Sequence, residues 1–216
     1  MGAHYPVMML KIAVLASGSG TDLQSVLDAC DNGQIDGKVV VVISNNPDAL
    51  ALERARNHGA EAVFIDHRGK TREDHEKQIS EEIDKRDIGL IVLAGYLRMF
   101  TSYFINKYKN KIINIHPALL PKYGGKGMHG FNVHRAVLES GDAESGCSVH
   151  LVTEEVDGGP VIARKRVDVL PDDTPESLQA RVLEKEHILL PLVVQWFAEG
   201  RVRIHGDEVE VMVGDD

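Results

Sequence analysis

Short apolar runs alternate with helical patterns through the first half of the chain. Five runs rich in β-branched residues lie at 10–16, 38–44, 62–66, 90–95 and 111–116. Runs of this length, bounded by glycine and polar turns, are typical of strands buried on both faces of a sheet. Helical patterns lie between them, at 22–30, 49–58 and 71–86. The alternation predicts an α/β fold: an open, twisted, mostly parallel, Rossmann-like sheet with helices on both faces.

The second half has a different pattern. Two strand-like runs, 147–153 and 159–170, follow each other without a helix between them, which predicts antiparallel pairing. A long helix is expected over 175–199, because apolar residues recur at helical spacing: Leu178, Val182, Leu189 and Val193. Thr174 is its expected N-cap, with Pro175 in the first turn.

The chain shows no internal repeat and no low-complexity linker, which predicts a single domain over residues 10–203. Residues 1–9 are expected to form an N-terminal extension. Residues 204–216 are expected to form a C-terminal tail, with a small hairpin or strand before a frayed acidic end.

Composition narrows the classes of function. The net charge is −9 without a block of Lys or Arg, which argues against a nucleic-acid partner. No apolar run is long enough to span a bilayer. Two cysteines, Cys30 and Cys147, are too few for a disulfide framework and indicate a reducing compartment. We therefore expect a cytoplasmic protein.

A glycine-containing loop, "ASGSGTDL", joins the first strand to the first helix. Gly18, Gly20 and Thr21 would let backbone N–H groups converge on an anion at the helix start. A plain tight turn capped by Thr21 or Asp22 is the alternative. A dinucleotide site is disfavoured, because Leu23 stands where the third glycine of that fingerprint belongs.

Asn114 and His116 lie at the predicted carboxyl end of the fifth strand, where open parallel sheets bind their ligands. Their spacing of two puts both side chains on one face, which suits stabilisation of an oxyanion. Asp157 could orient the imidazole and collect a proton. The alternatives stay open: Asn114 and His116 could end the strand, and Asp157-Gly158 could be an ordinary hairpin turn. Four histidines are candidate metal ligands: His116, His129, His134 and His150. They lack a compact metal-ligand spacing, so we expect no metal site.

Five segments together resemble the folate-dependent formyltransferase family: "NIHPALLPKY", "SVHLVTEEVDGGPVI", "GSGTDLQSVLDAC", "ISNNPDALALERARNHG" and "VLAGYLRMF". The resemblance covers nearly all of residues 10–203. It implies that the amine of glycinamide ribonucleotide takes the formyl group of the cosubstrate 10-formyltetrahydrofolate, a step of purine biosynthesis. It also implies a phosphate- and nucleotide-binding half over 10–110 and a catalytic and folate-binding half over 111–203.

The resemblance implies roles for individual residues. Asn114 and protonated His116 would hold the tetrahedral oxyanion, and Asp157 would raise the basicity of the imidazole and assist proton transfer. The phosphate would lie on the loop that contains Gly18, Gly20, Thr21 and Asp22, and Glu186 would bind the ribose. The folate would be bound by two segments: Leu97, Arg98 and Met99, and then Thr153, Glu154, Glu155, Val156 and Asp157.

Three departures from the family pattern affect the expected contacts. Asp22 stands where relatives usually have Asn, and Leu183 stands where a polar residue is common. The segment 124–135 is longer than in many relatives and is expected to be a surface loop, although some of its side chains could supply cationic groups or donors: Lys126, His129 and His134. His187 is expected to be a packing or surface residue.

The trio alone does not fix the acceptor. A related deformylase carries a leading regulatory domain, and about nine residues before the first strand are too few for one. Methionyl-tRNA formyltransferase needs a basic C-terminal domain, whereas this chain ends in an acidic tail. A non-catalytic phosphate-binding module is the other alternative, and the intact trio argues against it. The expected partners are the two small-molecule substrates, and a homodimer stays open.

Overall fold

The computed structural model describes residues 9–213. Met9 apart, the predicted extension over 1–9 lies outside the described residues, as does the acidic end at 214–216. Among the described residues, seven strands form one sheet in the order β3-β2-β1-β4-β5-β6-β7. Its strands are β1 (Leu10–Leu15), β2 (Gly37–Ser44), β3 (Glu61–Phe64), β4 (Leu90–Leu93), β5 (Ile112–His116), β6 (Glu144–Leu151) and β7 (Val161–Asp168).

Six helices and a hairpin complete the described part of the chain. The helices are α1 (Thr21–Asp31), α2 (Leu50–Asn57), α3 (Arg72–Asp84), α4 (Ser102–Lys107), α5 (Phe131–Ser140) and α6 (Pro175–Ala198). The predicted C-terminal hairpin is present as β8 (Val202–His205) and β9 (Glu208–Val211). Within residues 9–213, no helix is long and apolar enough to cross a membrane.

The sheet confirms the predicted fold class. Strands β1 to β5 pair in parallel, whereas β6 and β7 run antiparallel, as the change of pattern along the chain predicts. The order of the strands reverses between β1 and β4, because β1 leads outward to β2 and β3 and the chain then returns to β4 on its other side. Ligands of open α/β sheets bind beyond the carboxyl ends of the strands at such a switch point.

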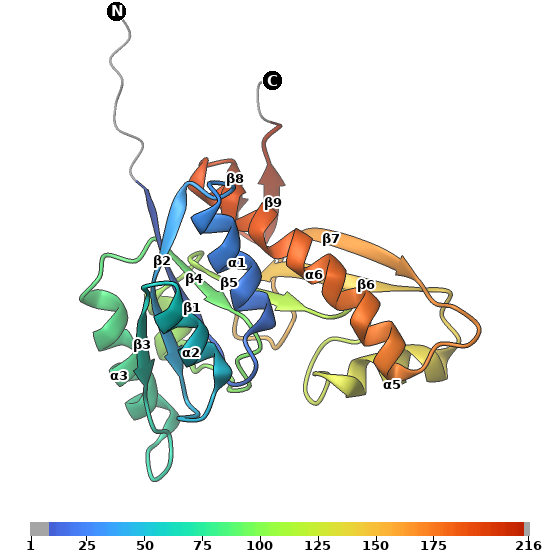
Figure 1. Cartoon of the computed structure of the whole chain (residues 1–216), viewed down its shortest axis with the longest axis horizontal. Coiled ribbons are helices and arrows are strands. Elements are labelled where there is room, and N and C mark those ends of the chain that lie inside the picture. The colour runs from blue at the N-terminus through green and yellow to red at the C-terminus, as the bar shows by residue number, and fades with distance from the viewer. Residues whose placement is uncertain (1–8, 214–216) are drawn as a thin grey trace, which may run out of the picture.

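Two apolar clusters cover the two faces of the sheet. One joins residues of α1, α2, α5 and α6 to the sheet, and the other joins residues of α3 and α4 to the opposite face. Figure 1 shows α6 lying across the antiparallel half of the sheet, with α1 beside it. The helices on one face therefore bring α6, from the end of the chain, next to the first helix.

The helix starts differ in how they are capped. The Thr174 side chain accepts a hydrogen bond from the Ser177 backbone N–H, and Pro175 is the first residue of α6, as predicted. At α1 the cap is Gly20, in the left-handed conformation, and no side chain caps the helix. The expectation that Thr21 or Asp22 caps this turn is therefore wrong.

Two helices are not predicted by the sequence pattern. Helix α4 has only six residues, too few to reveal a helical period. Helix α5 begins inside the segment 124–135 that was expected to be a surface loop, so only the residues before Phe131 are irregular. The glycines of "GGKGMHG" concealed the helix that follows them.

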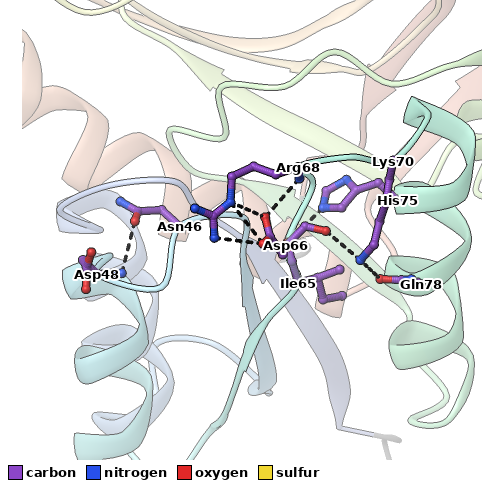
Figure 2. A network of polar contacts seen from close by, with 8 residues as sticks. All are labelled: Asn46, Asp48, Ile65, Asp66, Arg68, Lys70, His75 and Gln78. Atoms are coloured by element: carbon purple, nitrogen blue, oxygen red, sulfur yellow. Dashed lines mark hydrogen bonds and ion pairs between the residues drawn. The ribbon is translucent and has the colours of Figure 1, made fainter.

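Loops at the carboxyl ends of the strands are tied to one another by polar contacts. The Ser17 hydroxyl donates to Asn45 Oδ1 after β2 and accepts from the Leu97 backbone N–H after β4. Farther toward the edge, Figure 2 shows Asp66 bound by Arg68, and the buried His75 of α3 donating to the Ile65 carbonyl. These contacts hold the loops that surround the switch point.

Candidate active site

Strand β5 places Asn114 and His116 on one face at its carboxyl end, as the spacing of two predicts. The His116 side chain is buried, and its Nε2–H donates to the Tyr123 carbonyl at 2.8 Å. Because Nε2 carries this proton in the neutral ring, the lone pair lies on Nδ1. A single ring nitrogen is therefore left for proton transfer.

His150 belongs to the same cluster, which its position in the sequence does not predict. The antiparallel register pairs His150 of β6 with Asn114 of β5. His150 Nδ1–H donates to the Leu151 carbonyl at 2.9 Å, so Nε2 accepts from Asn114 Nδ2 at 3.0 Å. This contact fixes the orientation of the Asn114 amide, with its second N–H left for a ligand.

Asp157 lies between the two histidines. One of its carboxylate oxygens is 3.6 Å from His116 Nδ1, and the other is 3.6 Å from His150 Nε2. The Gly125 backbone N–H donates to Asp157 Oδ2 at 3.0 Å. Asp157 also has φ of 55° in the turn between β6 and β7. Asp157 thus lies in a turn and also faces both histidines, and its catalytic role stays a prediction.

Burial and neighbouring charges set the resting protonation of His116 and Asp157. Burial lowers the pKa of His116 below its ordinary 6.5, and this outweighs the opposing effect of Asp157. Burial alone would raise the pKa of Asp157, but the neighbouring His116 and the hydrogen bond from the Gly125 N–H contribute to lowering it below its ordinary value. The resting pair is therefore a neutral imidazole beside a carboxylate. Asp157 opposes this lowering of the pKa of His116, and the expected role of a protonated His116 in holding the oxyanion stays a prediction, because it concerns the reacting complex.

The glycine loop presents unused backbone donors. Gly20 has φ of 68°, a conformation that suits glycine. Within residues 9–213, no hydrogen-bond acceptor is found for the backbone N–H groups of residues 18–22. These groups surround the start of α1, where the helix dipole favours an anion. The loop thus has the donors that the phosphate interpretation requires.

A carboxylate pair lies beside this loop. Asp22 is largely buried, and burial raises its pKa to about 6. Glu186 of α6 is 6% exposed, and burial together with the charge of Asp22 raises its pKa well above the ordinary value. His187 Nε2 lies 3.8 Å from Asp22 Oδ1, and neither atom has a hydrogen-bond partner among the described residues. Since burial lowers the pKa of His187, it leaves the charge of Asp22 uncompensated.

The two predicted folate segments follow β4 and β6. The Leu97 N–H is already bound to Ser17 Oγ, so this group is not free for a ligand in the structure. The Thr153 hydroxyl donates to the Glu155 carbonyl, and the Gly158 N–H donates to the same carbonyl, which forms the turn. Large apolar side chains are exposed in both segments: Leu97, Met99 and Val156.

The remaining candidates differ in burial and in charge. Lys126 and His129 are exposed, whereas His134 is buried on α5 with its Nδ1 unpartnered among the described residues. Burial lowers the pKa of His134 to about 4, so the suggestion that it supplies a cation is wrong. Leu183 is half-buried on α6. Residues 9–213 contain no group of three or more side chains suited to hold a metal ion.

Comparisons with known proteins agree with this arrangement. A family described as "Formyl transferase" matches residues 10–194. A phosphoribosylglycinamide formyltransferase from Escherichia coli is 44% identical over 197 residues, covering 91% of each chain. The crystal structure of glycinamide ribonucleotide transformylase 1 from Symbiobacterium toebii superposes with a TM-score of 0.92 at 40% identity, covering 99% of each chain. A phosphoribosylglycinamide formyltransferase from Coxiella burnetii superposes with a TM-score of 0.88 at 42% identity, covering 94% of this chain and 93% of the other.

Proposed function

The chain belongs to the formyl transferase family, and we propose that Asn114, His116 and Asp157 perform its chemistry. It is an enzyme of purine biosynthesis that transfers a formyl group to glycinamide ribonucleotide, with a formyl-folate as the donor. We take the donor to be 10-formyltetrahydrofolate, and the products to be formylglycinamide ribonucleotide and tetrahydrofolate. The observation that carries the catalytic proposal is the meeting of the trio at the carboxyl end of β5, with His150 fixing Asn114.

In the proposed reaction, the amine nitrogen of the acceptor attacks the formyl carbon, and the carbonyl electron pair moves to the oxygen. The free N–H of Asn114 donates to this oxyanion, as donors of this kind contribute roughly 3–4 kcal/mol in acyl-transfer sites. The amine loses its proton to Nδ1 of His116, directly or through one water. Collapse of the intermediate breaks the bond to the folate nitrogen, which takes a proton from the imidazolium.

Asp157 has a defined part in this sequence. Its carboxylate faces the atom of His116 that gains the proton, at 3.6 Å. The imidazolium that forms is therefore stabilised by an adjacent negative charge, and that charge is present beforehand because the pKa of Asp157 is lowered. A neutral resting His116 is the state that can accept the proton of the amine.

The acceptor's phosphate is proposed to lie on the glycine loop. The unused N–H groups of residues 18–22 and the start of α1 support this assignment. We propose that Gly18, Gly20, Thr21 and Asp22 contact the phosphate through their backbone, because the Asp22 carboxylate would repel it. Glu186, on the adjacent α6, is proposed to bind the ribose hydroxyls.

The folate is proposed to lie between the segments Leu97–Met99 and Thr153–Asp157. Their exposed apolar side chains support this, because a pterin ring needs flat apolar contacts beside its backbone hydrogen bonds. The two segments follow β4 and β6, which are the strands that pair with β5. Arg98 has no ion-pair partner among the described residues, which leaves it available to a carboxylate of the folate tail.

The enzyme acts on small-molecule substrates, and we propose that it does so in the cytoplasm. The two free thiols, of Cys30 and Cys147, support a reducing compartment. A homodimer stays a prediction that sedimentation would test.

A spectrophotometric assay tests the function. Purified protein is mixed with 10-formyltetrahydrofolate, or its 5,8-dideaza analogue, and with glycinamide ribonucleotide. We expect folate release only when the acceptor is present. Release without the acceptor would indicate a deformylase, and no release from folded protein would contradict the proposed transfer.

A further inference from the structure

Three consecutive carbonyl groups of the glycine loop are bound on the side of α1 and α2. The Gly18 carbonyl accepts from the Ala51 N–H at 3.2 Å, and the Gly20 carbonyl accepts from the Gln24 N–H at 2.9 Å. Between them, the Ser19 carbonyl accepts from Nε of Arg54 at 2.8 Å. Of the three donors to these carbonyls, Arg54 is thus the one that donates from a side chain, and the other two are backbone N–H groups.

Binding these carbonyls determines where the amides point. The C=O of one residue and the N–H of the next lie in the plane of one trans peptide unit and point in opposite directions, so a fixed carbonyl fixes the N–H of the following residue. The loop also packs closely on α2, because a Cβ at Gly20 would lie 2.8 Å from the Ala51 Cβ. The unpaired N–H groups of Ser19 and Gly20 therefore owe their direction to α2, with Arg54 holding the middle of the loop.

Arg54 is itself held in place. Its Nη1 donates to Gln24 Oε1 at 2.8 Å, and Gln24 Nε2 lies 2.8 Å from Asp28 Oδ1 and 2.8 Å from His58 Nε2. His58 Nδ1 in turn lies 2.6 Å from Asp31 Oδ2. This chain of contacts ties α1 to α2 and leaves the guanidinium little freedom.

The charge of Arg54 is directed at the same place. No carboxylate forms an ion pair with Arg54 within residues 9–213. Arg54, Thr21 and His187 are among the residues that line a cavity of about 770 Å³ beside α1 and α6. Its positive charge also contributes to lowering the pKa of His187. An unneutralised guanidinium beside a row of free amides favours a bound anion.

We propose that Arg54 is a positioning residue for the phosphate of the acceptor: it fixes the Ser19 carbonyl so that the loop amides converge on the phosphate, and its charge attracts the dianion. This inference rests on the proposed function. The competing explanation is that Arg54 only joins α1 to α2, and it predicts a loss of stability without selectivity between the two substrates.

The test uses Arg54→Met, which keeps the length of the side chain but removes its donors and charge. Arg54→Lys restores the charge. Arg56→Met is the matched control, because Arg56 is exposed on the same helix and its side chain makes no hydrogen bond or ion pair among the described residues. Each variant is assayed for kcat and for the KM of each substrate. Inorganic phosphate is titrated into each by calorimetry and used as an inhibitor against the acceptor.

In Arg54→Met, we expect the acceptor KM and the phosphate dissociation constant to rise about tenfold to a hundredfold, as for the loss of hydrogen bonds to a charged group. The folate KM and kcat should change less than about twofold, since neither involves the loop. Arg54→Lys should recover part of the loss, and Arg56→Met should match the wild type.

Two results would overturn the inference: an unchanged acceptor KM and phosphate affinity in folded Arg54→Met, or an equal rise in both KM values with a lower Tm. The proposed function is tested separately by the same set. A wild type that binds phosphate in an Arg54-dependent manner but transfers no formyl group would support the inference and contradict the function.

Discussion

At the carboxyl end of β5, the polar groups of Asn114, His116 and Asp157 have protein partners before any ligand binds. At the start of α1, by contrast, five consecutive backbone N–H groups, Asp22 Oδ1 and His187 Nε2 have none among the described residues. The unpaired loop amides can bind the phosphate of the acceptor, whereas the buried atoms of Asp22 and His187 cost stability because they lack a partner. The comparison indicates that the catalytic end is preorganised, whereas the acceptor end is completed by its substrate.

The largest effect is expected at the preorganised end. In Asp157→Asn the side chain keeps its size and tolerates the positive φ of 55°, but the charge beside His116 is lost. We expect kcat to fall by roughly 10²–10⁴, the usual contribution of acid–base catalysis. The measurement is steady-state kinetics together with thermal unfolding. A fall in Tm that accounts for the lost activity would make Asp157 a structural residue.

The dependence of kcat on pH in Asp157→Asn gives a second test of its pairing with His116. His116 must be neutral to accept a proton, so activity should rise with pH through its pKa, which lies below the ordinary 6.5. Asp157 raises that pKa, so its replacement by Asn should move the acid limb of kcat to lower pH. An acid limb that does not move would contradict the pairing of the two residues.

At the acceptor end, Asp22→Asn is expected to stabilise the protein. The pKa of Asp22 rises from 3.8 to about 6 on folding, so the folded state binds the proton more tightly. Stability from this group is therefore present at low pH and is lost as the pH rises from about 4 to 6. At pH 7 the ionised carboxylate costs roughly 3 kcal/mol, by the usual conversion of 1.36 kcal/mol for each pH unit.

The free energy of unfolding of Asp22→Asn should thus exceed that of the wild type at pH 7, and the difference should vanish near pH 4. Above pH 6, Asp22→Asn should also bind the acceptor more tightly than the wild type, because the ionised carboxylate of the wild type would repel the phosphate. A denaturant titration at the two pH values provides the measurement. Lower affinity in Asp22→Asn would mean that the carboxylate organises the loop and does not oppose the phosphate.

A smaller effect is expected from His150, which acts through Asn114. In His150→Leu the amide loses its acceptor, and kcat should fall about tenfold or more, because the oxyanion donor is no longer oriented. His150→Gln retains an acceptor and should recover part of that loss, with the KM of both substrates near the wild-type values. Equal activity in the Leu and Gln variants would show that the contact with Asn114 does not matter.

The smallest effect is expected at the surface network of Figure 2. Arg68 is exposed and binds the half-buried Asp66, so Arg68→Gln leaves no fully buried group unpaired. We expect its Tm to stay within about 1 °C of the wild type, as for most exposed ion pairs. A drop of several degrees would mean that satisfied surface contacts contribute as much as the buried groups of the acceptor end.

The strands and the long helices could be predicted, because their apolar periods are set by the sequence itself. Helix α4 was too short for a period, and α5 followed a glycine-rich segment. The trio could be identified through its resemblance to a family. His150 could not, since its contact with Asn114 depends on the antiparallel register of β5 and β6. The neutrality of His116 and the raised pKa of Asp22 depend on burial by other elements, which no local pattern reveals.

The most direct test of the central claim compares wild type with His116→Gln under saturating glycinamide ribonucleotide and 10-formyltetrahydrofolate. The account predicts acceptor-dependent folate release by the wild type, and a release at least about a hundredfold slower from the variant. The variant should keep the wild-type affinity for inorganic phosphate, which reports an intact acceptor end. Equal rates in the two proteins would contradict proton transfer through His116, and with it the assignment of the trio.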